Sequence, residues 1–98
     1  MNKKVAWSKR AKASLDYYCD RIALESPPSA KKVRKKIVTI AKSLSKNPNL
    51  YQVDEHYPDN PGNIRRFFQW SYRVVYQVRE ESVVILNVYH TSQHPETK

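Results

Sequence analysis

Three runs of strand-forming residues, separated by short turns, fill the last third of this 98-residue chain. Residues 64–69, 72–79 and 82–90 are rich in Val, Ile, Tyr and Phe, which favour β-strands. Two-residue loops at Trp70-Ser71 and Glu80-Glu81 fit between them. Strands joined by such short connections pair antiparallel, so the sequence predicts an antiparallel three-stranded sheet near the C-terminus.

The first half of the chain predicts a short strand followed by two helices. Val5 and Trp7 alternate with their neighbours, which is typical of a strand. Apolar residues then recur at helical spacing over residues 9–25 and again over about residues 28–46. Ser26-Pro27-Pro28 separates the two helices, because proline is tolerated in a first helical turn but not in an interior.

Residues 47–63 predict a loop, since they hold three of the six prolines and the only glycine. A weak strand near Leu50–Val53 is the one regular element expected there. The resulting order, β-α-α-β-β-β, predicts an α+β fold with a two-helix hairpin on one face of a mostly antiparallel sheet. A chain of this length makes one domain, over residues 1–98.

Positive charge is concentrated in the first half of the chain. Residues 1–48 contain 13 Lys and Arg against three Asp and Glu, whereas residues 49–98 contain five against six. This asymmetry indicates a polyanionic partner such as nucleic acid, the ribosome or an acidic protein. The alternative is a solvated basic helix surface without a partner.

Several kinds of site are not expected. Cys19 is the only cysteine, which excludes an internal disulfide and predicts a buried small residue in a reducing, cytoplasmic setting. No apolar run approaches the length of a membrane span. The three histidines are too scattered for a metal site, and a single glycine provides no phosphate-binding loop, so no metal or cofactor is expected.

Strand alternation predicts which side chains share a face of the sheet. With two-residue loops at both turns, Val75 opposes Leu86 and Arg66 opposes Val75. Arg66, Arg73 and His90 would then lie on one face, with Arg65 on the opposite face. Two arginines could hold a phosphate while the imidazole transfers a proton, which is a chemistry for RNA cleavage. The same cations could instead bind an acidic partner.

Aromatic side chains in these strands favour core packing over base stacking. Trp70 is the exception, because it falls in a turn and is expected to be exposed.

The residues also carry a family resemblance, which extends over nearly the whole chain. Its main parts are Trp7-Ser8, Ser26-Pro27-Pro28-Ser29-Ala30, Arg65-Arg66, Tyr72-Arg73-Val74-Val75-Tyr76-Gln77-Val78 and Val83-Val84-Ile85-Leu86-Asn87-Val88-Tyr89-His90. Their order and spacing resemble the RelE/ParE superfamily of toxins from bacterial type II toxin–antitoxin modules, also known as plasmid stabilisation proteins. The resemblance implies an antitoxin partner and no small-molecule substrate.

The superfamily has two functional branches. RelE-like members are ribosome-dependent mRNA endonucleases, and ParE-like members inhibit DNA gyrase. By resemblance, Arg73 matches the arginine of a Tyr-Arg-Leu-Val-Tyr-like strand, Arg66 falls near a lysine position, and His90 matches the catalytic histidine of YoeB-like nucleases. Thr91 stands where those enzymes end in tyrosine, and the second arginine and terminal tyrosine of RelE have no counterpart.

The resemblance slightly favours the ParE-like branch. The Ser26–Ala30 junction and the segment from His90 to Pro95 are similar to that branch, although the histidine occurs in both. Arg66, Arg73 and His90 are the catalytic candidates if the chain is a nuclease. The candidate partner-binding residues are Arg65, Arg66, Trp70, Arg73, His90 and Gln93. A non-toxic basic nucleic-acid-binding module is the remaining alternative.

Overall fold

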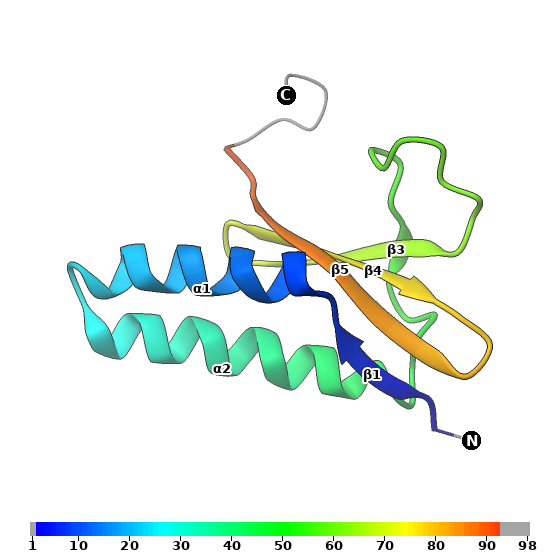
Figure 1. The fold of residues 1–98 in the computed structure, drawn as a ribbon, viewed down its shortest axis with the longest axis horizontal. Helices are drawn as coiled ribbons and strands as arrows, with labels where there is room; N and C mark the ends of the chain where they lie inside the picture. The colour runs from blue at the N-terminus through cyan, green and yellow to red at the C-terminus, as the bar shows by residue number, and fades with distance from the viewer. Residues whose placement is uncertain (1, 93–98) are drawn as a thin grey trace.

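A computed structural model describes residues 2–92, as a five-stranded sheet with both helices on one face (Figure 1). The elements are β1 (Lys4–Trp7), α1 (Lys9–Ala23), α2 (Pro27–Ser43), β2 (Gln52–Val53), β3 (Ile64–Gln69), β4 (Tyr72–Val78) and β5 (Ser82–His90). The predicted α+β fold and order of elements are confirmed, and the weak strand expected near residue 52 is present as β2. No helix among residues 2–92 is both long and apolar enough to cross a membrane.

The sheet is mixed, in the order β1-β5-β4-β3-β2. β1 pairs parallel with β5, and every other pair is antiparallel. The helical hairpin carries the chain from β1 at one edge of the sheet to β2 at the other, and β3, β4 and β5 then fill the space between them. The chain therefore places its last strand, β5, between its first strand and β4.

Serine caps begin both helices. The Ser8 hydroxyl accepts a hydrogen bond from the Ala11 N–H at 3.0 Å, and the Ser26 hydroxyl accepts one from the Ser29 N–H at 3.3 Å. Pro27 and Pro28 occupy the first positions of α2, where a missing N–H costs no intrahelical bond. The two serines and the two prolines are therefore the residues from which the starts of both helices could be predicted.

The core lies between the helical hairpin and the sheet. Apolar residues of both helices meet aromatic and branched side chains of β3, β4 and β5 there; the fully buried members include Ala11, Ile37, Ala41, Leu44, Phe67, Val74, Tyr76, Val83, Ile85 and Val88. Cys19 is buried in the same layer, as predicted, and burial raises the pKa of its thiol. Tyr76 is fully buried and donates its hydroxyl hydrogen to the Pro48 carbonyl at 2.9 Å.

A β-bulge in β5 changes the register that the two-residue turns predict. Tyr76 pairs with Ile85 as expected, but Val75 pairs with Asn87, so Leu86 is the additional residue on β5. Beyond this point every partner is displaced by one, and Arg73 pairs with Tyr89 instead of Val88. The prediction that His90 shares the face of Arg66 and Arg73 is therefore wrong, because a one-residue shift moves a strand's side chains to the opposite face.

Hydrogen bonds from α1 and its cap stabilise the bulge. Ser8 donates its hydroxyl to the Leu86 carbonyl at 2.9 Å, and Ser14 donates its hydroxyl to Asn87 Oδ1 at 2.7 Å. Asn87 Oδ1 also accepts the Val88 N–H at 2.8 Å. Side chains thus form hydrogen bonds with backbone groups of β5 that the bulge removes from the strand pairing.

Replacing Tyr76 by Phe tests the contribution of its buried hydroxyl. The lost hydrogen bond should lower the free energy of unfolding at neutral pH by about 1 kcal/mol. Burial raises the Tyr76 pKa to about 12, from 10.0 in the exposed side chain. The stabilisation from the protonated hydroxyl is thus complete below about pH 10 and is lost as the pH rises towards 12.

Denaturant unfolding at several pH values measures both effects. Tyr76→Phe should decrease the loss of stability between pH 10 and pH 12. Tyr17→Phe, at a ring that is 55% exposed, is the matched control and should not change stability at pH 7. An unchanged pH profile for Tyr76→Phe would show that this hydroxyl has no such role.

Candidate functional site

Arg66 and Arg73 lie on the sheet face that is not covered by the helices. Arg66 pairs with Val75 and Phe68 pairs with Arg73, so these side chains share one face of β3 and β4. Arg65 pairs with Tyr76 and points to the helical side, as predicted. The sequence therefore placed the three arginines on the correct faces.

Arg73 is buried in an ion pair with Asp54. Its Nη1 lies 3.1 Å from Asp54 Oδ2 and 3.4 Å from Oδ1, and the Asp54 side chain is fully buried. The Arg73 guanidinium also lies over the Tyr89 ring, at 4.5 Å from its centroid. Since Arg73 is 6% exposed, its charge is neutralised and shielded within the protein.

Asp54 also organises the loop that follows β2. Its Oδ1 accepts the His56 N–H at 2.9 Å, and its backbone N–H donates to the Ile64 carbonyl at 2.9 Å. The Asn60 amide donates to the carbonyls of Asp54 and Ile64, at 2.9 and 2.8 Å. The ion pair therefore holds this loop against the centre of the sheet, at Arg73 of β4.

Arg66 is held in place near the surface. Its Nη2 lies 3.2 Å from Gln52 Oε1 and 3.4 Å from Glu55 Oε1, and its guanidinium stacks on Phe68 at 4.9 Å. The Glu55 backbone and then the charge of Arg66 hold the Glu55 carboxyl pKa below its usual value. Arg66 Nε is buried, and no partner satisfies it among residues 2–92.

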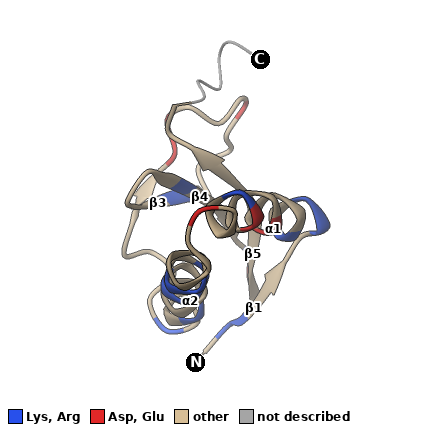
Figure 2. Cartoon of the chain, turned by 90° about the vertical axis from the view of Figure 1, so that its left-hand side faces the viewer, with Lys and Arg blue, Asp and Glu red and all other residues tan. Residues whose placement is uncertain are grey.

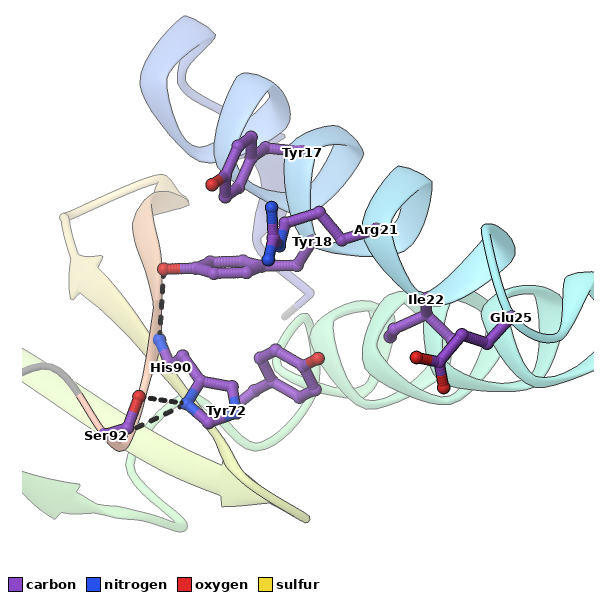
Figure 3. Close-up of a pocket in the computed structure, with 8 residues that line it drawn as sticks. All are labelled: Tyr17, Tyr18, Arg21, Ile22, Glu25, Tyr72, His90 and Ser92. Atoms are coloured by element: carbon purple, nitrogen blue, oxygen red, sulfur yellow. Dashed lines mark hydrogen bonds between the residues drawn. The ribbon is translucent and has the colours of Figure 1, made fainter.

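His90 lies on the opposite face, next to α1. It pairs with Tyr72, and the two rings meet edge to face with centroids 5.2 Å apart. The Tyr18 hydroxyl accepts the His90 backbone N–H at 3.2 Å (Figure 3). The structure thus separates His90 from Arg66 and Arg73, and the predicted three-residue cluster does not form.

A pocket of about 450 Å³ lies between α1 and the ends of β4 and β5, with His90 on its wall (Figure 3). We call it the His90 pocket; its lining residues are Tyr17, Tyr18, Arg21, Ile22, Glu25, Tyr72, His90 and Ser92. Burial raises the pKa of the Tyr72 hydroxyl above its ordinary value. The pocket therefore combines an imidazole, phenol hydroxyls and the guanidinium of Arg21.

Hydrogen bonds define the tautomer of His90. The Ser92 backbone N–H donates to Nδ1 at 3.1 Å, and the Ser92 hydroxyl lies 2.8 Å from the same atom. A backbone N–H requires an acceptor, so neutral His90 carries its proton on Nε2. In this arrangement Nε2 can donate a hydrogen bond to a bound anion.

The other candidate residues have separate locations. Arg65 donates to the Tyr51 carbonyl, and Trp70 is 51% exposed in the turn between β3 and β4. Gln93 lies outside the described residues. Figure 2 shows Lys and Arg gathered along α2, a helix that contains no Asp or Glu.

Two residues that contact the candidate site residues were not identified from the sequence. Asp54 falls within the loop predicted for residues 47–63, and Tyr18 falls within the helix predicted for residues 9–25. The sequence does offer a sign for Asp54: it is an acidic residue in a loop, and the later strand that contains Arg73 needs an acidic partner if that arginine is buried. For Tyr18 the sequence carried no such signal, because its contact with His90 follows from the bulge.

Three solved structures share this fold. The chromosomal ParDE toxin–antitoxin system from P. aeruginosa matches with a TM-score of 0.70 and 23% identity, over 90% of this chain and 95% of that chain. The toxin–antitoxin complex RelBE2 from Mycobacterium tuberculosis matches with a TM-score of 0.64 and 20% identity, over 95% of each chain. The YoeB dimer from Staphylococcus aureus matches with a TM-score of 0.62 and 22% identity, over 92% of this chain and 99% of that chain.

Sequence comparison identifies the family. The family model for the ParE toxin of type II toxin–antitoxin systems, parDE, matches residues 5–95. Comparison with curated protein sequences found no match. Because the family model spans nearly all of the chain, this protein belongs to the ParE toxin family, within the RelE/ParE superfamily that its sequence resembles.

Replacing Asp54 by Ala tests the structural role of the ion pair. The substitution leaves the Arg73 charge buried without a partner, so we expect a loss of roughly 3–5 kcal/mol in the free energy of unfolding. Glu55→Ala is the matched control, because it removes a neighbouring carboxylate that is 62% exposed, and Arg66 keeps its contacts with Gln52 and Phe68, so stability should change much less. Equal effects of the two substitutions in denaturant unfolding would contradict the assignment.

Proposed function

We propose that this chain is the toxin of a type II toxin–antitoxin module, that it inhibits DNA gyrase, and that a cognate antitoxin neutralises it. The proposal rests on membership of the ParE toxin family. Inhibition would be a binding function, with the basic helices and the C-terminal strand as contact surfaces. No covalent step by this chain is required.

One structural observation supports binding over RNA cleavage. Arg73, which matches the arginine of RelE-like sites, is buried and neutralised by Asp54. An arginine that stabilises the charge of a cleaved phosphodiester must reach the phosphate directly. Arg66 is likewise engaged with Glu55 and Gln52, and His90 lies on the other face of the sheet.

The surface also supports an antitoxin partner. Large apolar side chains are exposed outside the helical layer, including Leu50 at 66%, Phe68 at 50% and Val53 at 40%. Val53 pairs with Arg65 on one face of the sheet, and Phe68 lies beside Arg66 on the other, so both faces offer apolar and charged contacts near β3. A segment of an acidic antitoxin that folds on binding would cover both kinds of surface.

Ribosome-dependent mRNA cleavage is the second candidate, and the His90 pocket favours it. There His90 and Arg21 line one cavity together with Tyr17 and Tyr18, and Glu25 is the one acidic residue of its wall. This set could bind a phosphate and transfer a proton. Such a site would differ from the predicted one, because Arg66 and Arg73 do not contribute to it.

Two assays with the purified chain distinguish the candidates. We expect the protein to reduce supercoiling by gyrase and to leave mRNA intact in a translating system. Expression without an antitoxin should also arrest growth, whereas unaffected growth would favour a non-toxic nucleic-acid-binding module.

Variants make the comparison decisive. Cleaved mRNA that disappears with His90→Ala or Arg21→Ala would replace the gyrase proposal by the nuclease. Glu80→Gln changes an exposed charge in the turn between β4 and β5, outside the pocket, and it serves as the control. Intact mRNA together with normal supercoiling would contradict both candidates.

A further inference from the structure

A second hollow lies between α2 and the turn that joins β3 to β4. It has a volume of about 310 Å³ and shares no lining residue with the His90 pocket. We call it the Trp70 site; it is lined by Lys32, Lys35, Lys36, Thr39 and Trp70. None of the functions considered above uses these residues together.

The lysines of this site form one stripe along α2. Lys32, Lys35, Lys36 and Thr39 follow the i, i+3, i+4, i+7 spacing of a single helix face. Like charges at these spacings repel, and no Asp or Glu of α2 compensates them. The ion pairs found among residues 2–92 do not include these lysines. The stripe is therefore an exposed concentration of unpaired cations.

Trp70 adopts an unfavourable backbone conformation. Its φ is +53°, a left-handed value that glycine or asparagine adopts more readily than a bulky side chain. The indole is half exposed instead of buried in the core, and Lys32 Nζ lies 6.0 Å from its ring centroid. Strained residues of this kind concentrate at sites that bind ligands. The turn thus presents a flat aromatic surface beside the lysine stripe.

We propose that the Trp70 site binds single-stranded nucleic acid, with one base stacked on the indole and the adjacent phosphates bound by Lys32, Lys35 and Lys36. An exposed aromatic ring next to a line of cations is the arrangement that single-strand binding proteins use, because every base has a face that stacks. An acidic polypeptide would neutralise the lysines but would not need the flat, exposed ring. This proposal does not depend on gyrase inhibition, since it concerns direct binding by the toxin alone.

Binding to a short oligothymidylate tests the proposal. In a Trp7→Phe background, Trp70 is the only tryptophan, and we expect its emission to be quenched as the oligonucleotide binds. With three phosphate contacts, the logarithm of the binding constant should fall with the logarithm of salt concentration at a slope of about −2. Anisotropy of a labelled oligonucleotide then compares the variants in the full chain.

The variants separate stacking from charge. Trp70→Ala should weaken binding about tenfold or more, and Trp70→Phe should retain most of the affinity. The double variant Lys35→Gln/Lys36→Gln should reduce the salt slope by about 1.4. Lys12→Gln removes an exposed charge from α1 and is the matched control, with affinity close to that of the unchanged protein.

Three results would overturn the proposal. The first is oligonucleotide binding that does not change in Trp70→Ala, with circular dichroism showing that the variant is folded. The second is equal affinity for inorganic polyphosphate, which carries charge without bases. The third is equal quenching by polyglutamate, which would assign the site to an acidic polypeptide. Failure here leaves the gyrase assay unaffected, so the two proposals are tested separately.

Discussion

The ion pair between Asp54 and Arg73 connects the loop that follows β2 to the middle of the sheet. One partner comes from an irregular loop and the other from the middle of the sheet, and both side chains are almost completely buried. A buried charge is costly unless it is paired and hydrogen-bonded. Asp54 meets this condition through Arg73 and the His56 N–H, and Arg73 adds its contact with the Tyr89 ring. The loop, the short strand β2 and the face of β3 and β4 consequently keep a fixed arrangement.

The bulge at Leu86 divides the candidate site into two surfaces. Without the additional residue, His90 would extend from the same face as Arg66 and Arg73. With it, His90 joins Tyr18 and Tyr72 against α1, while the arginines remain on the face outside the helices. The same sequence therefore yields one face on which Arg66 and Arg73 are paired with acidic side chains, and a separate pocket that His90 and Arg21 line.

Much of the fold could be predicted because its signals are local. Ser8, Ser26 and the two prolines marked the helix starts, and the turn at Trp70-Ser71 fixed the register of β3 against β4. The bulge could not be predicted by counting turn residues, because it depends on hydrogen bonds from Ser8 and Ser14 across about 75 positions of the chain. The polar Asn87 within an apolar strand was its only local sign. Arg73 was identified, but its long-range partner Asp54 was not, and this partner changes the arginine from an exposed cation into part of the interior.

Family membership and this geometry are consistent with a toxin that acts through its surfaces and in which Arg73 supports the fold. The most direct test is inhibition by the double variant Asp54→Asn/Arg73→Met, in which an uncharged pair replaces the ion pair. The new amide oxygen at position 54 can still accept the His56 N–H. Replacing a buried ion pair by uncharged groups of similar size is often neutral for stability. We predict that the folded double variant arrests growth and inhibits gyrase as the unchanged protein does. A folded variant that has lost both effects would show that Arg73 contacts the target, and would contradict a purely structural role for this arginine.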